Sequence, residues 1–286
     1  MYHKQVNIID FIMSNNTSYT QGHHSAVLSS HQWRTVENSA AYVIPYLKRN
    51  TKMLDIGCGP ATITLDFASR LPEGHVTGLD VGESVIESAR SLAKEKGITN
   101  VNFITGDVFD LKACGLEGKK FDIVHAHQTI MHIADRLGAI KAMQGLLRPG
   151  GILAIRDADM ATSTHNPHFA EIDRHFQIME QSVSAAGGHS NGAREHLSLV
   201  LAAGFARDKV KLSLGTWCYS TQVERAWWGN TNARRITETE LRQRAKDFAK
   251  ATDDEIERIA GAWRKWSECE DGIWTLMHFE IIAEKS

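Results

Sequence analysis

The stretch MLDIGCGPATIT, residues 53–64, decides the fold. It opens with an apolar run typical of a buried strand, breaks at Gly57 and Gly59, and resumes as a helical pattern through Leu65 and Phe67. A strand, a glycine turn and a helix in this order build a nucleotide-sized site at the carboxyl end of the first strand of an α/β sheet. Glycines suit such a turn because they bend tightly and let a ligand approach bare backbone.

Downstream of this stretch, apolar strand patterns alternate with amphipathic helix patterns. Helices are expected over residues 84–96 and 135–147, and each is followed by a glycine-containing break. Because parallel strands need helical crossovers, the alternation predicts a mostly parallel, Rossmann-like α/β sheet with helices on both faces. The expected strands of this part are residues 53–56, 75–80, 101–104, 121–125 and 152–155.

The two ends of the chain depart from this rhythm. Residues 1–50 are expected to form an N-terminal helical cap over the cofactor end of the sheet, with one helix over residues 35–47. Residues 51–286 are expected to form a single domain with helical inserts at about 160–192 and 221–270. Two late strands are expected at residues 210–214 and 274–283.

Composition excludes several classes of function. The 286 residues carry 32 Lys and Arg against 34 Asp and Glu, a net charge of −2, so no basic field argues for nucleic acid. The four cysteines are far apart, with no CxxC pair, which indicates a reducing compartment and gives no zinc signature. No apolar run approaches the ~20 residues of a membrane span, and no signal peptide is visible. We expect a soluble, cytoplasmic protein whose partner is a small molecule.

Two cofactors compete for the glycine turn, a nicotinamide dinucleotide and S-adenosylmethionine. The dinucleotide fingerprint needs a small residue three places after the second glycine, where this chain has Thr62. Asp80 ends the second expected strand, the place where an acid accepts ribose hydroxyls of either cofactor. Asp107, which follows Gly106 after the third, can accept an adenine amino group, with the ring between Val81 and Val108. The second acid favours S-adenosylmethionine.

Five motifs in this order resemble the class I S-adenosylmethionine-dependent methyltransferases, and within them the UbiE-like branch that acts on small molecules. They are LDIGCGPATIT, GLDVGESVIESAR, GDVFDL, FDIVHAHQTIMHI and LLRPGGILAIRD, and they cover residues 50–157. The resemblance implies a seven-stranded sheet whose last strand is antiparallel. One departure is Ala61, where the family often has a third glycine.

The resemblance also implies roles for individual positions. Asp55 and the Gly57–Gly59 backbone lie near the methionine part of the cofactor in such proteins, Asp80 takes the ribose and Asp107 the adenine. His125 lies beside the sulfonium and the amino acid moiety. The implied products are a methylated acceptor and S-adenosylhomocysteine.

Candidates for chemistry follow the fourth and fifth expected strands. Methyl transfer is an in-line displacement, and a base is needed only where the acceptor must lose a proton. His127, His132 and Asp157 are the candidate catalytic residues; the alternative is that the histidines wall the cofactor and that Asp157 caps a helix. No metal site is expected around these histidines, because no carboxylate or cysteine joins them at ligand spacing.

The acceptor is expected to contact the cap and the tryptophan-rich inserts. Arg34 can clamp a carboxylate of the cofactor or acceptor, or lie free on the surface. The tryptophans can form flat apolar walls, or be ordinary core. The candidate acceptor-binding residues are His24, Trp33, Arg34, Trp217 and Trp228.

The sequence therefore predicts an enzyme that methylates a small, hydrophobic acceptor at O, N, S or an activated carbon. The alternative is a protein of the same fold that uses bound S-adenosylmethionine for a non-methylating conversion, such as a rearrangement or cyclisation. A nicotinamide oxidoreductase and a non-catalytic binding module are the remaining readings.

Overall fold

A computed structural model describes residues 33–286. Most of the expected cap, residues 1–50, and the candidate residue His24 therefore lie outside the described residues. Within them, no helix has the length and apolar character that crossing a membrane requires.

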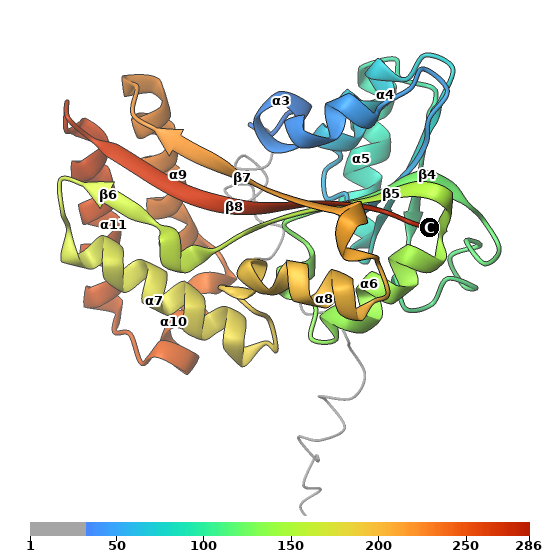
Figure 1. Ribbon diagram of the computed structural model, residues 1–286. Helices are drawn as coiled ribbons and strands as arrows, with labels where there is room; N and C mark the ends of the chain where they lie inside the picture. The colour runs from blue at the N-terminus through green and yellow to red at the C-terminus, as the bar shows by residue number, and fades with distance from the viewer. Residues whose placement is uncertain (1–32) are drawn as a thin grey trace, which may run out of the picture.

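An eight-stranded sheet organises the described part of the chain (Figure 1). Its order is β3-β2-β1-β4-β5-β8-β6, and β7 also pairs with β8. Strands β1 to β5 run parallel, whereas β8 is antiparallel to β5, β6 and β7. The strands are β1 (Lys52–Ile56), β2 (His75–Asp80), β3 (Val101–Thr105), β4 (Phe121–His127), β5 (Leu147–Ala158), β6 (Thr164–Asn166), β7 (Val210–Tyr219) and β8 (Ile273–Glu284). The predicted Rossmann-like sheet with an antiparallel last strand is confirmed.

The glycine turn follows β1, which is an interior strand of the sheet. β1 pairs with β2 on one side and β4 on the other, and four of its five residues are buried. Strands covered on both faces read as continuous apolar runs, which is why this stretch was recognisable. The register aligns Ile56 with Leu79 and Ala126, so Gly57, Asp80 and His127 meet at one edge of the sheet.

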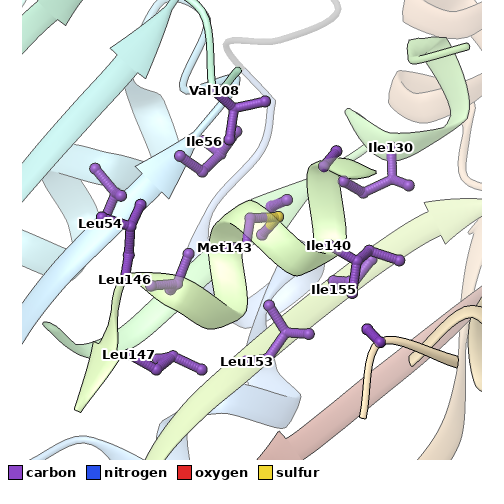
Figure 2. Packing of buried hydrophobic residues seen from close by; sticks show 14 of the residues in the cluster. Leu54, Ile56, Val108, Ile130, Ile140, Met143, Leu146, Leu147, Leu153 and Ile155 are labelled. Atoms are coloured by element: carbon purple, nitrogen blue, oxygen red, sulfur yellow. The ribbon is translucent and has the colours of Figure 1, made fainter. Parts of the chain in front are cut away.

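Helices cover both faces of the sheet. The short α3 (Val36–Ser39), α4 (Thr62–Arg70) and α5 (Glu83–Glu95) lie on one face, and α6 (Arg136–Gly145) and α8 (His196–Ala202) on the other (Figure 1). Figure 2 shows the second interface, where Ile140 and Met143 of α6 pack with Leu54 and Leu153 of the sheet. These side chains are fully buried.

A second core lies at the far end of β7 and β8. It is formed with α7 (Ala170–Ala185), α9 (Gln222–Glu238), α10 (Glu240–Ala249) and α11 (Asp253–Glu268). Trp263, Trp266 and Trp274 are fully buried in it, as are Ile256 and Ile259 of α11. A Thr221 capping box begins α9. Figure 1 shows this helical layer beside the extended ends of the two strands.

Several expected boundaries were wrong. The helix expected over residues 35–47 is α3 followed by a 3₁₀ helix, Ala41–Tyr46, that contains Pro45. The expected seven strands are joined by an eighth, β6. β4 runs on to His127 and β5 runs from Leu147 to Ala158, so Asp157 lies within a strand and does not follow it.

Candidate functional site

The glycine turn has three residues in the left-handed region of backbone conformation. The φ angles are 67° at Gly57, 55° at Gly59 and 67° at Ala61. A Cβ at Gly57 would lie 2.3 Å from Oγ1 of Thr129, so glycine is required and the turn contacts the segment that follows β4. Ala61 has a Cβ, and for such a residue the left-handed conformation costs about 1–2 kcal/mol of conformational free energy. The departure from the family pattern therefore strains the turn but preserves its shape.

Asp80 is held at the carboxyl end of β2 by backbone amides. Its Oδ2 accepts from the Gly59 amide at 3.0 Å and its Oδ1 from the Gly82 amide at 3.0 Å. The carboxylate is partly exposed, and each oxygen keeps a lone pair for a further donor. This arrangement fits a carboxylate that accepts the two ribose hydroxyls of an adenosyl cofactor.

The second acid, Asp107, follows β3 at the same edge. Its Oδ1 accepts from the Phe109 amide at 3.0 Å, and its side chain is partly exposed. Beside it, Val81 is 46% exposed, whereas Val108 is 3% exposed and packs near Ile56 in the core (Figure 2). Asp107 and Val81 can therefore meet an adenine ring, while contact with Val108 stays a prediction.

Gly106 lies between these elements and admits no side chain. A Cβ there would lie 2.3 Å from Sγ of Cys114. The Gly106 amide donates to the Asp80 carbonyl oxygen at 2.9 Å, which ties the end of β3 to the end of β2. Gly106 therefore helps to hold the ends of β2 and β3 together, and its contact with a cofactor stays a prediction.

Asp55 and His125 form a buried pair beneath the turn. His125 Nδ1 lies 2.7 Å from Asp55 Oδ1, and Thr64 Oγ1 donates to Asp55 Oδ2 at 2.6 Å. The His125 ring meets Phe67 of α4 edge-on, with centroids 5.2 Å apart. Both side chains are buried, and their contacts with each other, with Thr64 and with Phe67 join β1, β4 and α4. Their direct contact with a cofactor stays a prediction.

His127, the last residue of β4, is buried at the carboxyl edge of the sheet. Neither ring nitrogen makes a hydrogen bond to residues 33–286. Its ring lies 6.4 Å from that of His278 and 6.1 Å from that of Trp217, centroid to centroid. Burial, and then the charges of Arg156 and Arg34, hold the pKa of His127 well below 6.5. The imidazole is therefore neutral at neutral pH, and its nitrogen lone pair is available.

Gln128, which follows, is a site residue that the sequence did not indicate. It has φ 49°, an uncommon conformation for a residue with a side chain. Arg34 Nη2 donates to its Oε1 at 3.1 Å, and its Nε2 lies 3.0 Å from Nε2 of His278. Strained backbone held by specific contacts is common at functional sites.

Arg156 is a second residue that the sequence did not indicate. It pairs with His127 in the β4–β5 register and is 2% exposed. Its Nε donates to Glu280 Oε1 at 3.1 Å, while its Nη1 is buried without a partner among the described residues. The guanidinium carbons of Arg156 and Arg34 lie 5.5 Å and 5.4 Å from the Trp217 ring centroid. Two cations thus share one aromatic ring beside His127.

Asp157 points away from this cluster, as expected for the residue after Arg156 on a strand. It is fully buried and accepts from the amides of Thr129 and Met131 and from Nε2 of His196, each at 2.9 Å. These contacts favour a role in holding the segment after β4, so its catalytic role stays a prediction. Burial lowers the pKa of the other candidate, His132, to about 4.

The predicted aromatic residues come together beyond Trp217. Trp33 stacks on Trp227 with centroids 5.1 Å apart, and Tyr219 lies 5.0 Å from Trp228. Trp33 is 37% exposed, whereas Trp217 and Trp228 are buried. Trp33, Trp217 and Trp228 each contact the Tyr219 ring, and Arg34 and His127 lie beside Trp217. The role of these residues in acceptor binding stays a prediction. His24 lies outside the described residues.

A sheet with this strand order, a glycine turn and two acids at its carboxyl edge has the arrangement expected of an S-adenosylmethionine-dependent methyltransferase. The family described as the methyltransferase domain matches residues 47–211, and the chain belongs to it. S-adenosylmethionine is accordingly its cofactor, and the site residues fit that molecule.

Two relatives span nearly the whole chain, and a third matches part of it. An uncharacterised methyltransferase of Schizosaccharomyces pombe is 29% identical over 93% of this chain and 96% of its own. The probable methyltransferase ltbC of Aspergillus luteorubrus is 31% identical over 94% of this chain and 97% of its own. A demethylmenaquinone methyltransferase of Listeria welshimeri is 33% identical over 39% of this chain and 46% of its own, which supports the expected likeness to the UbiE-like branch.

Solved structures share the fold at low sequence identity. A putative methyltransferase of Bacillus halodurans has a TM-score of 0.54 at 18% identity, covering 86% of this chain and 97% of its own. The [4+2]-cyclase SpnF has a TM-score of 0.51 at 16% identity, covering 97% of this chain and 92% of its own. The fold alone is thus compatible with methylation and with the cyclisation alternative.

Proposed function

We propose that this enzyme methylates a small, largely apolar molecule whose reacting end lies against His127, Gln128 and Arg156. The methyl group comes from S-adenosylmethionine and passes by in-line displacement to an O, N, S or activated carbon atom. The observation that carries the proposal is the buried imidazole of His127, which has no hydrogen-bond partner within residues 33–286 and lies at the edge of the sheet that holds the glycine turn. A buried polar atom without a partner costs about 1–3 kcal/mol, which a ligand atom would offset.

The position of this imidazole relative to the turn supports the proposal. Thr129, two residues after His127, contacts Gly57 so closely that no Cβ fits between them. Thr129 Oγ1 also lies within hydrogen-bond distance of the carbonyl oxygens of Ile56 and His127, at 3.2 Å and 3.1 Å. An acceptor bound at His127 would therefore lie next to the cofactor's methionine end, as in-line transfer requires.

The Arg156 guanidinium beside His127 favours an acceptor with an acidic oxygen. Its Nε donates to Glu280, whereas its buried Nη1 has no partner among residues 33–286. A guanidinium N–H that is still available stabilises a phenolate, enolate or carboxylate oxygen. A neutral His127 can accept the proton where that oxygen arrives protonated. The aromatic group of Trp33, Trp217 and Trp228 would contact the apolar remainder.

The decisive experiment is a screen of small-molecule pools with methyl-labelled S-adenosylmethionine. We expect label in a product, together with an equal amount of S-adenosylhomocysteine. Conversion of a pool compound without S-adenosylhomocysteine would instead support the non-methylating alternative. For an identified acceptor, His127→Ala should lower turnover while calorimetry shows unchanged S-adenosylmethionine affinity. A loss of cofactor affinity alone would assign His127 to the cofactor and not to the acceptor.

A further inference from the structure

The corner between β6 and α7 brings together three side chains that no step of methyl transfer uses. His165 lies in β6, His168 in the connection, and Asp173 in the first turn of α7. One ligand atom of each lies within 4.8 Å of the others. The spacing is His-x₂-His-x₄-Asp, and it lies outside the cluster of His125, His127 and His132 where no metal site is expected.

The distances suit ligands of one ion better than hydrogen bonds. His165 Nδ1 is 3.7 Å from Asp173 Oδ1, and His168 Nδ1 is 3.5 Å from Asp173 Oδ2. A charge-assisted N–H···O bond would be about 2.7–2.9 Å long. Zinc binds nitrogen and oxygen at roughly 2.0–2.2 Å, so two ligands of a tetrahedral ion are roughly 3.3–3.5 Å apart. Small side-chain rotations therefore suffice to seat an ion between the three groups.

The backbone beside His165 offers its ring two hydrogen-bond partners. The side chain is 4% exposed, and its Nε2 accepts from the Phe169 amide at 3.0 Å and lies 3.3 Å from the Phe169 carbonyl oxygen. When Nδ1 binds a metal, Nε2 carries the proton, so it gives up the amide and donates to that carbonyl oxygen, which is a common support for a metal-bound histidine.

Two of the three ligands lie on anchored elements. His165 pairs with Trp274 of β8, and Trp266 Nε1 donates to the carbonyl oxygen of the next residue, Asn166, at 3.0 Å. Asp173 is next to the fully buried Ile172, which fixes the first turn of α7 in the helical layer. His168 is 71% exposed at its side chain and reaches the corner from solvent. His165 and Asp173 are thus held in place by the fold, while the solvent-exposed side near His168 leaves room for a water ligand.

We propose that His165, His168 and Asp173 bind one transition-metal ion of the zinc class. Two imidazoles and one carboxylate suit Zn²⁺, Ni²⁺, Co²⁺ or Cu²⁺, whereas Ca²⁺ and Mg²⁺ prefer all-oxygen sets. The ion would connect β6 to α7 and stabilise the helical layer, since a ligand that binds only the folded chain raises its stability.

The test is a calorimetric titration of the tag-free, full-length protein with Zn²⁺ alone, after treatment with a chelator. We expect one site that is lost, or weakened at least about tenfold, in His168→Ala and in Asp173→Asn. His168 is exposed, so its replacement does not endanger folding. Glu171→Gln, in the same helical turn, removes the same charge as Asp173→Asn without removing a ligand, and should bind zinc as the wild type does.

Two further readouts do not depend on enzymatic turnover. Zn²⁺ should raise the melting temperature of the wild type and of Glu171→Gln, but not that of His168→Ala. Co²⁺ bound at the corner should give the visible absorption of a low-coordinate site, and Mg²⁺ should not compete with it. Equal zinc binding by the wild type and His168→Ala, or no binding by either, would overturn the proposal. Neither result would bear on methyl transfer.

Discussion

Gln128 Nε2 lies 3.0 Å from Nε2 of His278, and this contact joins the end of β4 to β8 across 150 residues of sequence. The amide is oriented by Arg34, whose Nη2 donates to Gln128 Oε1 at 3.1 Å. The Gln128 NH₂ group must therefore donate to His278, which accepts only when its ring is neutral at that nitrogen. Burial, together with the charges of Arg156 and Arg34, holds the pKa of His278 well below 6.5, which keeps it neutral.

Replacing Gln128 should separate the function of its side chain from the strain of its backbone. Both Gln128→Ala and Gln128→Gly remove the contacts to Arg34 and His278, so both should lower turnover to a similar extent. Only the alanine variant keeps a Cβ at φ 49°. We therefore expect Gln128→Gly to be more stable than Gln128→Ala by about 1 kcal/mol in urea unfolding. Equal stabilities would show that the left-handed conformation relaxes in the variants.

Asp80 should determine cofactor affinity. Hydrogen bonds to a charged group contribute about 1.5–3 kcal/mol each, and the carboxylate is proposed to accept two ribose hydroxyls. Asp80→Ala should therefore weaken S-adenosylmethionine binding by a factor of roughly 10² to 10⁴, measured by calorimetry. Glu87→Ala, an exposed acid on α5, makes the same change in net charge and should leave the affinity unchanged. Unchanged affinity in Asp80→Ala would contradict the ribose assignment.

The parts of the fold that the sequence predicted are those where burial is uniform. The run from Met53 to Ile56 is apolar apart from Asp55 because β1 is covered on both faces, and the same reasoning applies to β2, β4 and residues 152–155 of β5. β3 is an exception, because only Phe103 of its five residues is buried. β6, with the sequence Thr164-His165-Asn166, has no apolar pattern and is a strand only because β8 pairs with it. The strand expected at residues 210–214 continues to Tyr219, because β8 pairs with it along its full length.

The sequence predicted the site residues only where they directly follow or end a predicted strand. Asp80 and Asp107 stand where strands end, and parallel strands end at one edge. Arg156 and Asp157 could not be assigned from the sequence, because their opposite directions depend on β5 running on to Ala158. Gln128 and His278 meet through the register of β4, β5 and β8, which no local pattern encodes.

The hydrogen bond between Asp157 and His196 should contribute mainly to stability. Both side chains are fully buried, so His196→Ala leaves a cavity and removes one of three donors to the carboxylate. We expect the free energy of unfolding to fall by about 3 kcal/mol. His168→Ala, measured in chelator, replaces an exposed histidine and should change it by less than about 0.5 kcal/mol. A stable His196→Ala variant with greatly reduced turnover would argue instead that Asp157 takes part in catalysis.

Acid should destabilise the helical layer through His175. The ring is fully buried and accepts from Trp263 Nε1 at its Nδ1, at 2.6 Å. Burial, and then the charge of Arg235, lowers the pKa of His175 to about 3. Below pH 6.5 the unfolded chain binds a proton that the folded chain does not, so stability falls as the pH falls from about 6.5 toward 3. The slope is about 1.4 kcal/mol per pH unit for one such histidine.

The variant His175→Asn tests this slope. Asn Oδ1 can replace Nδ1 as the acceptor for Trp263, but the amide does not titrate. Between pH 7 and pH 5, the wild type should lose roughly 2 kcal/mol more stability in urea unfolding than His175→Asn does, because about 1.5 pH units lie below the unfolded pKa. All other titrating groups are common to the two proteins and cancel in the comparison. The same loss in both proteins would mean that His175 takes up a proton in the folded state.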